Sequence, residues 1–200
     1  MKLYFMPGAC SLAPHIALRE AALPFSLVEV DYHSRRTACD GDFRAVNPKG
    51  YVPALVLGDG QVLTEVPVIL QYIDALAPGA ALMPKPAMSR YRTLEWLNYV
   101  ATEIHKSFSP LFRPSTPQAF LKPGREHLSR RLAVVEAHLD RNRYLGGSDI
   151  SLPDIYLFTV CRWLDAQEMS LEAWPALKRH FADVSMRSAV QDALAAEGMR

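Results

Sequence analysis

The chain has 200 residues, of which half are apolar and 22% are charged, and this composition excludes a disordered or fibrous protein. Its 22 basic and 21 acidic residues nearly cancel, so no general positive field steers it onto nucleic acid or an anionic membrane. No apolar run approaches transmembrane length, and the first one is too short for a signal peptide. We expect a cytoplasmic protein, folded as one compact chain or two modest domains, with neither nucleic acid nor membrane as a partner.

The three cysteines, Cys10, Cys39 and Cys161, have no paired spacing and form no Cys-x-x-Cys motif. Neither a disulfide framework nor a zinc site is indicated, so we expect no metal and a reducing compartment.

The N-terminal region predicts a β-α-β unit. Residues 2–6 form a short apolar run suited to a buried strand, residues 25–30 form another, and a helix with Pro14 in its first turn lies between them. Cys10 is expected at the start of this helix, where free N–H groups and the helix dipole favour thiolate over thiol. The alternative is a small buried thiol that only packs.

The next segment predicts a hairpin followed by a helix. Residues 51–57 and 61–63 read as two strands joined by a tight turn, and Pro53 belongs at the start of the first, where a cis Val52-Pro53 bond is expected. A helix then opens at Thr64 and Glu65, with Thr64 as the candidate N-cap, and stops at Pro78-Gly79.

No strand signal follows the segment 80–86, which reads as a linker. Apolar residues at helical spacing from Leu94 to Phe108 predict a helix, and Ser151-Leu152-Pro153-Asp154 has the form of a capping box that starts a helix over 152–164. The sequence therefore predicts an α/β domain over residues 1–79 and an all-helical domain over residues 87–200.

This order of elements resembles the thioredoxin superfamily, and with a helical domain attached it resembles a cytosolic glutathione transferase. The motifs that carry the resemblance span nearly the whole chain and are similar to those of the bacterial beta class. They are Lys2-Leu3-Tyr4, Pro7-Gly8-Ala9-Cys10-Ser11-Leu12, Val46-Asn47-Pro48-Lys49-Gly50, Val52-Pro53-Ala54-Leu55, Leu63-Thr64-Glu65, Glu95-Trp96-Leu97-Asn98, Glu103-Ile104-His105-Lys106, Ser109-Pro110-Leu111-Phe112, Asp154-Ile155-Tyr156-Leu157-Phe158, and Ala195 with Glu197 and Gly198.

The resemblance implies a homodimer that uses glutathione as co-substrate and directs it at a small hydrophobic electrophile. It makes Cys10 the catalytic cysteine, able to form a mixed disulfide with glutathione, and His105 its polar neighbour. It places Phe108 and Phe112 in the electrophile pocket. The glutathione-binding groups that it implies are Arg35, Val52, Pro53, Glu65, Val66, Asn98, Glu103 and Lys106, of which Asn98 and Glu103 reach a site across the dimer interface.

Two positions depart from the family pattern. Val66 stands where glycine or serine is common, which keeps the backbone donor but adds a β-branched side chain. Arg35 replaces a frequent lysine, which keeps the charge and changes its geometry.

The chemistry of glutathione fits these residues independently of the resemblance. Its two carboxylates, one ammonium and one thiol need an anion site, an acid and a cation, which a helix start, Glu65 or Glu103, and Arg35 supply. Cys10 lacks a resolving partner because Ala13 stands where a dithiol oxidoreductase has cysteine. Any redox role must therefore take a thiol from outside.

Two other functions stay open. Cys10 can serve a glutathione-dependent thiol transferase, peroxidase or dehalogenase, or the chain can be a non-catalytic binding or regulatory protein on the same scaffold, which Val66 keeps in play. In isolation, Glu65 also reads as a dipole partner in a first helical turn, and His105, Arg35 and Lys106 as ordinary surface groups.

Overall fold

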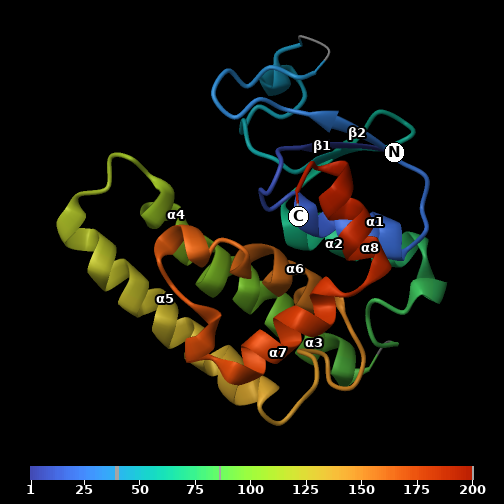
Figure 1. The fold of residues 1–200 in the computed structure, drawn as a ribbon. Coiled ribbons are helices and arrows are strands. Elements are labelled where there is room, and N and C mark those ends of the chain that lie inside the picture. The colour runs from blue at the N-terminus through green and yellow to red at the C-terminus, as the bar shows by residue number, and fades with distance from the viewer. Residues whose placement is uncertain (39–40, 86, 200) are drawn as a thin grey trace. The chain divides into compact units, whose positions relative to one another are not determined.

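The computed structural model describes residues 1–38, 41–85 and 87–199 (Figure 1). These residues form two compact units. The first combines Met1–Leu82 with the C-terminal segment from Arg187 onward, and the second is Met83–Met186.

The first unit is built on a four-stranded mixed sheet in the order β2-β1-β3-β4. Its strands are β1 (Lys2–Phe5), β2 (Ser26–Glu29), β3 (Ala54–Val56) and β4 (Val62–Thr64). β1 pairs in parallel with β2 and antiparallel with β3, which in turn pairs antiparallel with β4. The predicted β-α-β unit and hairpin are confirmed, and so is the cis Val52-Pro53 bond.

Three helices pack together on one side of this sheet (Figure 1). They are α1 (Leu12–Glu20), α2 (Val66–Leu76) and α8 (Ser188–Ala196). α2 begins one residue later than expected, because Thr64 ends β4 and Glu65 serves as the N-cap.

The C-terminal helix α8 belongs to the first unit, whereas the sequence placed it in a helical domain over 87–200. Polar contacts that no local sequence pattern predicts hold α8 in this position. The buried Glu197 carboxylate accepts from the Gly8 N–H at 3.0 Å and pairs with His15 Nδ1 at 2.8 Å. Arg187 also pairs with Glu20, with Nη2 and Oε2 2.8 Å apart. These contacts join the end of the chain to its first loop and first helix.

The second unit is helical in the part of the chain that is described. Its longer elements are α3 (Met88–Tyr99), a π-helical segment η3 (Val100–His105), α4 (Lys106–Phe112), α5 (Gln118–Leu139), α6 (Leu152–Cys161) and α7 (Pro175–Ser185). The stripe from Leu94 to Phe108 predicted one continuous helix, but η3 interrupts it with a wider turn, a feature that often occurs at functional sites. Every residue of α6 is buried, as its apolar sequence predicted.

Short 3₁₀ helices fill several of the connections. They are η1 (Phe43–Ala45), η2 (Pro78–Ala80), η4 (Asp165–Gln167) and η5 (Leu171–Ala173). η2 ends at Ala80, the first residue of the segment that the sequence reads as a linker.

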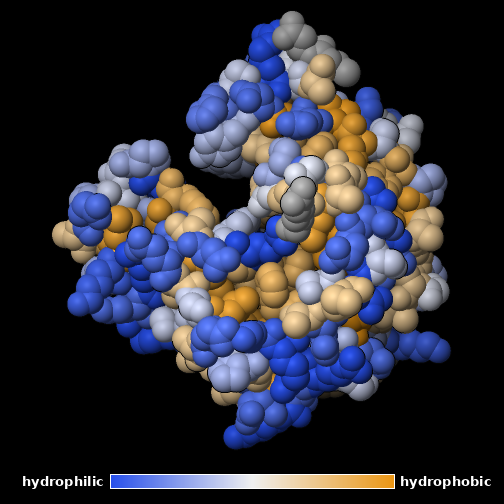
Figure 2. All heavy atoms as spheres, in the orientation of Figure 1, coloured by the Kyte–Doolittle hydropathy of each residue, from blue (hydrophilic) through white to orange (hydrophobic). Residues whose placement is uncertain are grey.

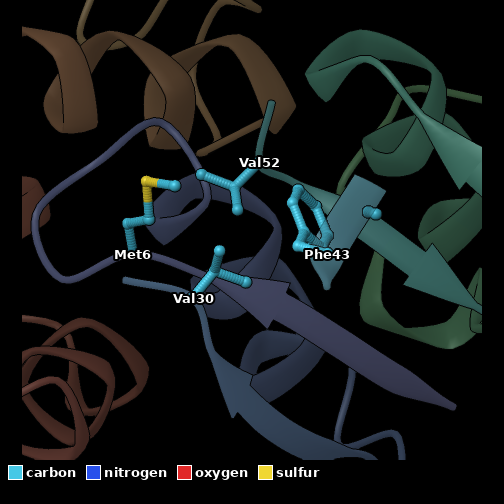
Figure 3. Packing of buried hydrophobic residues seen from close by; sticks show 5 residues of the cluster. Met6, Val30, Phe43 and Val52 are labelled. Carbon is cyan, nitrogen blue, oxygen red and sulfur yellow. The ribbon is translucent and has the colours of Figure 1, made fainter. Parts of the chain in front are cut away.

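Apolar packing behind the ends of β1 and β3 fixes the loops at that edge of the sheet. Met6, Val30, Phe43, Val52 and Ala54 form one buried cluster. Figure 3 shows the side chains of Met6 and Val52 pointing toward one another across it. The segment that leads to Cys10 and the segment that precedes β3 are therefore held by the same core.

The exposed side chains of the second unit are mainly polar or charged. Most of the second unit's face that is visible in Figure 2 is hydrophilic, with apolar side chains gathered in limited patches. Within the described ranges, no helix is both long and apolar enough to span a bilayer.

Asp154 holds the start of α6 in a buried polar network. Its carboxylate accepts from Ser151 N at 2.8 Å, Ser151 Oγ at 2.6 Å and Leu145 N at 2.7 Å, and it pairs with His180 Nε2 at 2.9 Å. The cap was expected from the sequence, but the contacts with Leu145 and His180 were not.

We expect Asp154→Ala to lower the free energy of unfolding by about 3–5 kcal/mol, because several buried donors lose their acceptor at once. Urea denaturation followed by circular dichroism measures this loss. Asp149→Ala is the matched control, since Asp149 is exposed and its replacement should cost less than about 0.5 kcal/mol. Equal stability of the two variants would contradict a structural role for the network.

Candidate functional site

Cys10 lies in the loop between β1 and α1, two residues before the first helical residue. The Ala9 N–H donates to the Met6 carbonyl at 3.1 Å, and Gly8 adopts φ +71°, which turns the chain toward the helix. The Cys10 thiol is partly buried and donates to the carbonyl oxygen of Val52 at 3.4 Å. The loop thus places the sulfur against the backbone that precedes β3.

The ionisation of Cys10 differs from the sequence expectation. Burial raises the pKa of its thiol from 9.0 to about 12, and the nearby charge of Glu65 adds to the rise. Hydrogen bonds from the backbone N–H groups of Cys10 and Ser11 lower the pKa but do not offset burial. The expectation that the helix start favours thiolate was therefore wrong for this structure, because loss of hydration outweighs the local dipole.

Val52 and Pro53 reach the site through a braced turn. The buried Asn47 donates from Nδ2 to the Tyr51 carbonyl at 2.6 Å, and its Oδ1 accepts from the Lys49 N–H at 3.2 Å. From the sequence, Asn47 and Lys49 were only part of a motif that carries the family resemblance. The structure shows that Asn47 sets the approach of the Val52 carbonyl to Cys10.

Glu65 stands at the junction of β4 and α2 with φ +71°, a conformation that is uncommon for any residue but glycine. Its carboxylate is 63% exposed and pairs with Lys49 Nζ at 2.6 Å. Val66 is buried, so the β-branched group that departs from the family pattern packs into the core.

Arg35 lies in the loop after β2, also with positive φ. Its guanidinium sits over the Tyr32 ring at 5.0 Å and donates from Nη1 to Met6 Sδ at 3.5 Å. The first unit thus brings Cys10, Val52, Glu65 and Arg35 to neighbouring loops.

The second unit gathers an aromatic group around His105. His105 Nδ1 and the Tyr156 hydroxyl oxygen are 2.5 Å apart, and the imidazole packs edge-on against Trp163 with ring centroids 5.1 Å apart. Trp163 also contacts the rings of Phe108 and Phe112. Tyr156 and Trp163 were missed as site candidates, because the apolar sequence of α6 and of the residues after it predicted only core packing.

Three other residues that were predicted to bind glutathione lie in α3, η3 and α4 of the second unit. Asn98 and Lys106 are exposed, and the Glu103 carboxylate pairs with Arg131 at 2.9 Å. The neighbourhood of His105 and Cys10, and the reach of Asn98 and Glu103 across a dimer, stay predictions.

The remaining cysteines have no assigned chemistry. Cys161 is buried in α6, and burial raises the pKa of its thiol. Cys39 lies outside the described residues. Among those that are described, no three His, Cys, Asp or Glu side chains gather as a metal-binding group.

Comparison with known proteins gives family matches over most of the chain. Residues 8–76 match the model of the glutathione S-transferase N-terminal domain, and residues 99–187 match that of its C-terminal domain. The glutathione S-transferase GstA of Escherichia coli O157:H7 is 46% identical over the full length of both chains.

Solved structures agree with these matches. The bacterial glutathione transferase BphK, solved as a ternary complex, is 48% identical with a TM-score of 0.97. A sphingomonad glutathione S-transferase complexed with glutathione is 41% identical, and the beta-class enzyme of Sphingomonas chungbukensis is 40% identical, both with TM-scores of 0.96. Each comparison covers the whole of both chains.

The raised pKa of Cys10 predicts slow alkylation at neutral pH. Because only the thiolate reacts, the rate with iodoacetamide should rise about tenfold per pH unit to beyond pH 10, with no plateau between pH 6 and 9. Mass spectrometry of the labelled protein measures the rate, and Cys10→Ala supplies the background from the other two cysteines. A plateau near neutral pH would show that the thiolate is favoured after all.

Proposed function

The chain belongs to the glutathione S-transferase family, and we propose that it conjugates glutathione to small hydrophobic electrophiles. The observation that carries the proposal is the convergence of the Cys10 thiol, the Val52 backbone and the Glu65 carboxylate in one unit. Similarity to a beta-class structure and to one complexed with glutathione supports it.

In the proposed complex, the cysteinyl backbone of glutathione pairs with Val52 beside Pro53. The γ-glutamyl end binds Glu65 and the Val66 N–H. That N–H has no acceptor within the helix, as holds for first-turn N–H groups in general. Arg35 and Lys106 contribute positive charge near the peptide. This arrangement matches each charged group of the ligand with an opposite charge or a donor.

We assign Cys10 the role of a hydrogen-bond donor. Its raised pKa keeps the thiol protonated at neutral pH, and the S–H already donates to Val52. Since a thiol has one hydrogen, this S–H would turn from Val52 to the glutathione sulfur in the complex and stabilise its thiolate. Glutathione releases its thiol proton to water, and its thiolate attacks the electrophilic carbon. The new C–S bond forms, and the leaving group departs with its electron pair.

The electrophile belongs beside the aromatic group of the second unit. Phe108, Phe112 and Trp163 offer apolar ring surface, and Tyr156 fixes the orientation of His105. Such a surface suits flat, apolar substrates. We also propose a homodimer in the cytoplasm, in which Asn98 and Glu103 of the partner subunit contribute to the glutathione site.

A second candidate function is thiol exchange. Cys10 as a residue is only partly buried, and Ala13 rules out internal disulfide cycling. Attack of its thiolate on oxidised glutathione would form a mixed disulfide and release one reduced glutathione. The raised pKa makes this attack slow at neutral pH, because little thiolate is present. The donor role, by contrast, needs the protonated thiol.

Glutathione titrated into the reduced protein should bind with about one site per chain, and Glu65→Gln should weaken binding about tenfold, because a charged acceptor of the ligand ammonium is lost. Isothermal calorimetry measures both affinities. Glu172→Gln is the matched control, since the Glu172 carboxylate is 72% exposed and also pairs with a lysine.

The same preparations test the role of Cys10. Cys10→Ala should retain glutathione binding, lose mixed-disulfide formation with oxidised glutathione, and conjugate 1-chloro-2,4-dinitrobenzene more slowly. Absence of heat at millimolar glutathione in the wild type would contradict the proposed function and favour a non-catalytic protein.

A further inference from the structure

Lys49 and Glu65 form an open charge pair at the site proposed for the γ-glutamyl end of glutathione. Lys49 Nζ lies 2.6 Å from Glu65 Oε1 and donates to Thr64 Oγ1 at 3.0 Å. Both charged groups face solvent, since the Lys49 side chain is 52% exposed and that of Glu65 is 63% exposed. A ligand can therefore reach the pair without opening the fold.

Lys49 is held at both its ends. Its backbone N–H donates to Oδ1 of the buried Asn47, whose Nδ2 braces the Tyr51 carbonyl next to Val52. Its ammonium is held by the Thr64 hydroxyl as well as by the Glu65 carboxylate. Because Thr64 is a second anchor, Lys49 does not have to leave when another cation approaches Glu65.

The charge of the pair determines which ligand it accepts. A carboxylate alone attracts any ammonium, but it repels the α-carboxylate that an amino acid carries on the carbon next to its ammonium. A lysine ammonium beside it cancels that repulsion and has three N–H donors, two of which contact Thr64 and Glu65. The third can donate to an incoming carboxylate.

We propose that Lys49 is the residue that makes this site specific for a zwitterionic α-amino-acid end. Glu65 takes the ligand ammonium, and Lys49 takes the α-carboxylate. The inference rests on the proposed function, because it concerns the glutathione site, and it adds a recognition residue that the sequence did not assign.

The test compares two ligands that differ only in the α-carboxylate. S-methylglutathione carries both charges, whereas S-methyl γ-aminobutyryl-cysteinyl-glycine keeps the ammonium and lacks the α-carboxylate. Methylation of the sulfur prevents a disulfide with Cys10. Calorimetry of wild type and Lys49→Met with each ligand gives four affinities, and the ratio between the ligands is the readout.

Lys178→Met is the matched control. Lys178 pairs with Glu172 at 2.5 Å and is also 52% exposed, so its replacement removes the same charge and a similar ion pair from the other unit. Both ligands should bind this variant as they bind the wild type. Thermal unfolding of the two variants verifies that the fold is retained.

Lys49→Met should weaken S-methylglutathione about three- to tenfold, because a charge-assisted hydrogen bond is lost. The ligand without the α-carboxylate should change less than about twofold or bind more tightly, since Glu65 is freed from a competing cation. Equal weakening of both ligands would assign Lys49 a merely structural role. Tighter binding of both would make it a competitor, and either result overturns the proposal.

Failure of the inference is distinguishable from failure of the proposed function. A wild type that binds neither ligand contradicts the glutathione site itself. A wild type that binds S-methylglutathione, with a ligand ratio that Lys49→Met leaves unchanged, contradicts only the assignment of Lys49.

Discussion

The strand order of the sheet is the constraint on which the candidate site depends. β1 is central and lies antiparallel to β3, with Tyr4 opposite Ala54, so the loop that leaves β1 meets the segment that enters β3. β4 is antiparallel to β3, with Thr64 also opposite Ala54, and therefore ends at the same edge. β2 runs parallel to β1 and delivers its loop there too. One edge thus collects four segments that are distant in sequence.

Two of the described non-glycine residues with positive φ also lie at that edge. Arg35 and Glu65 both adopt positive φ without being glycine, which costs about 1–3 kcal/mol each. The buried cluster of Met6, Val30, Phe43, Val52 and Ala54 lies directly behind these loops and can hold such conformations in place. The geometry of the site therefore depends on the packing of the core in this unit, since the cluster residues lie close to the site residues in sequence.

The sequence predicted the strands and helices of the N-terminal βαβ and hairpin segments, but not the contacts between distant segments. Alternating strand and turn signals predicted the β-α-β unit and hairpin, because those patterns are local. The position of α8 depends on Glu197 meeting Gly8 and His15 almost a full chain length away, and no local pattern encodes such a meeting. The wider turn of η3 was missed for a related reason. An apolar stripe predicts which residues are buried, but it does not distinguish α-helical from π-helical backbone hydrogen bonds.

The chemistry of Cys10 illustrates the same limit. Its place before a helix was legible and argues for a thiolate, yet the net ionisation depends on how much water its neighbours remove. Val52 precedes β3 and Glu65 follows β4, and the sheet order brings both of them near the sulfur. The same order sets Glu65 beside Lys49, so the charge that opposes the Cys10 thiolate is itself partly balanced. A site of this kind is tuned by neighbours that belong to three separate segments, and its chemistry follows from topology more than from any single motif.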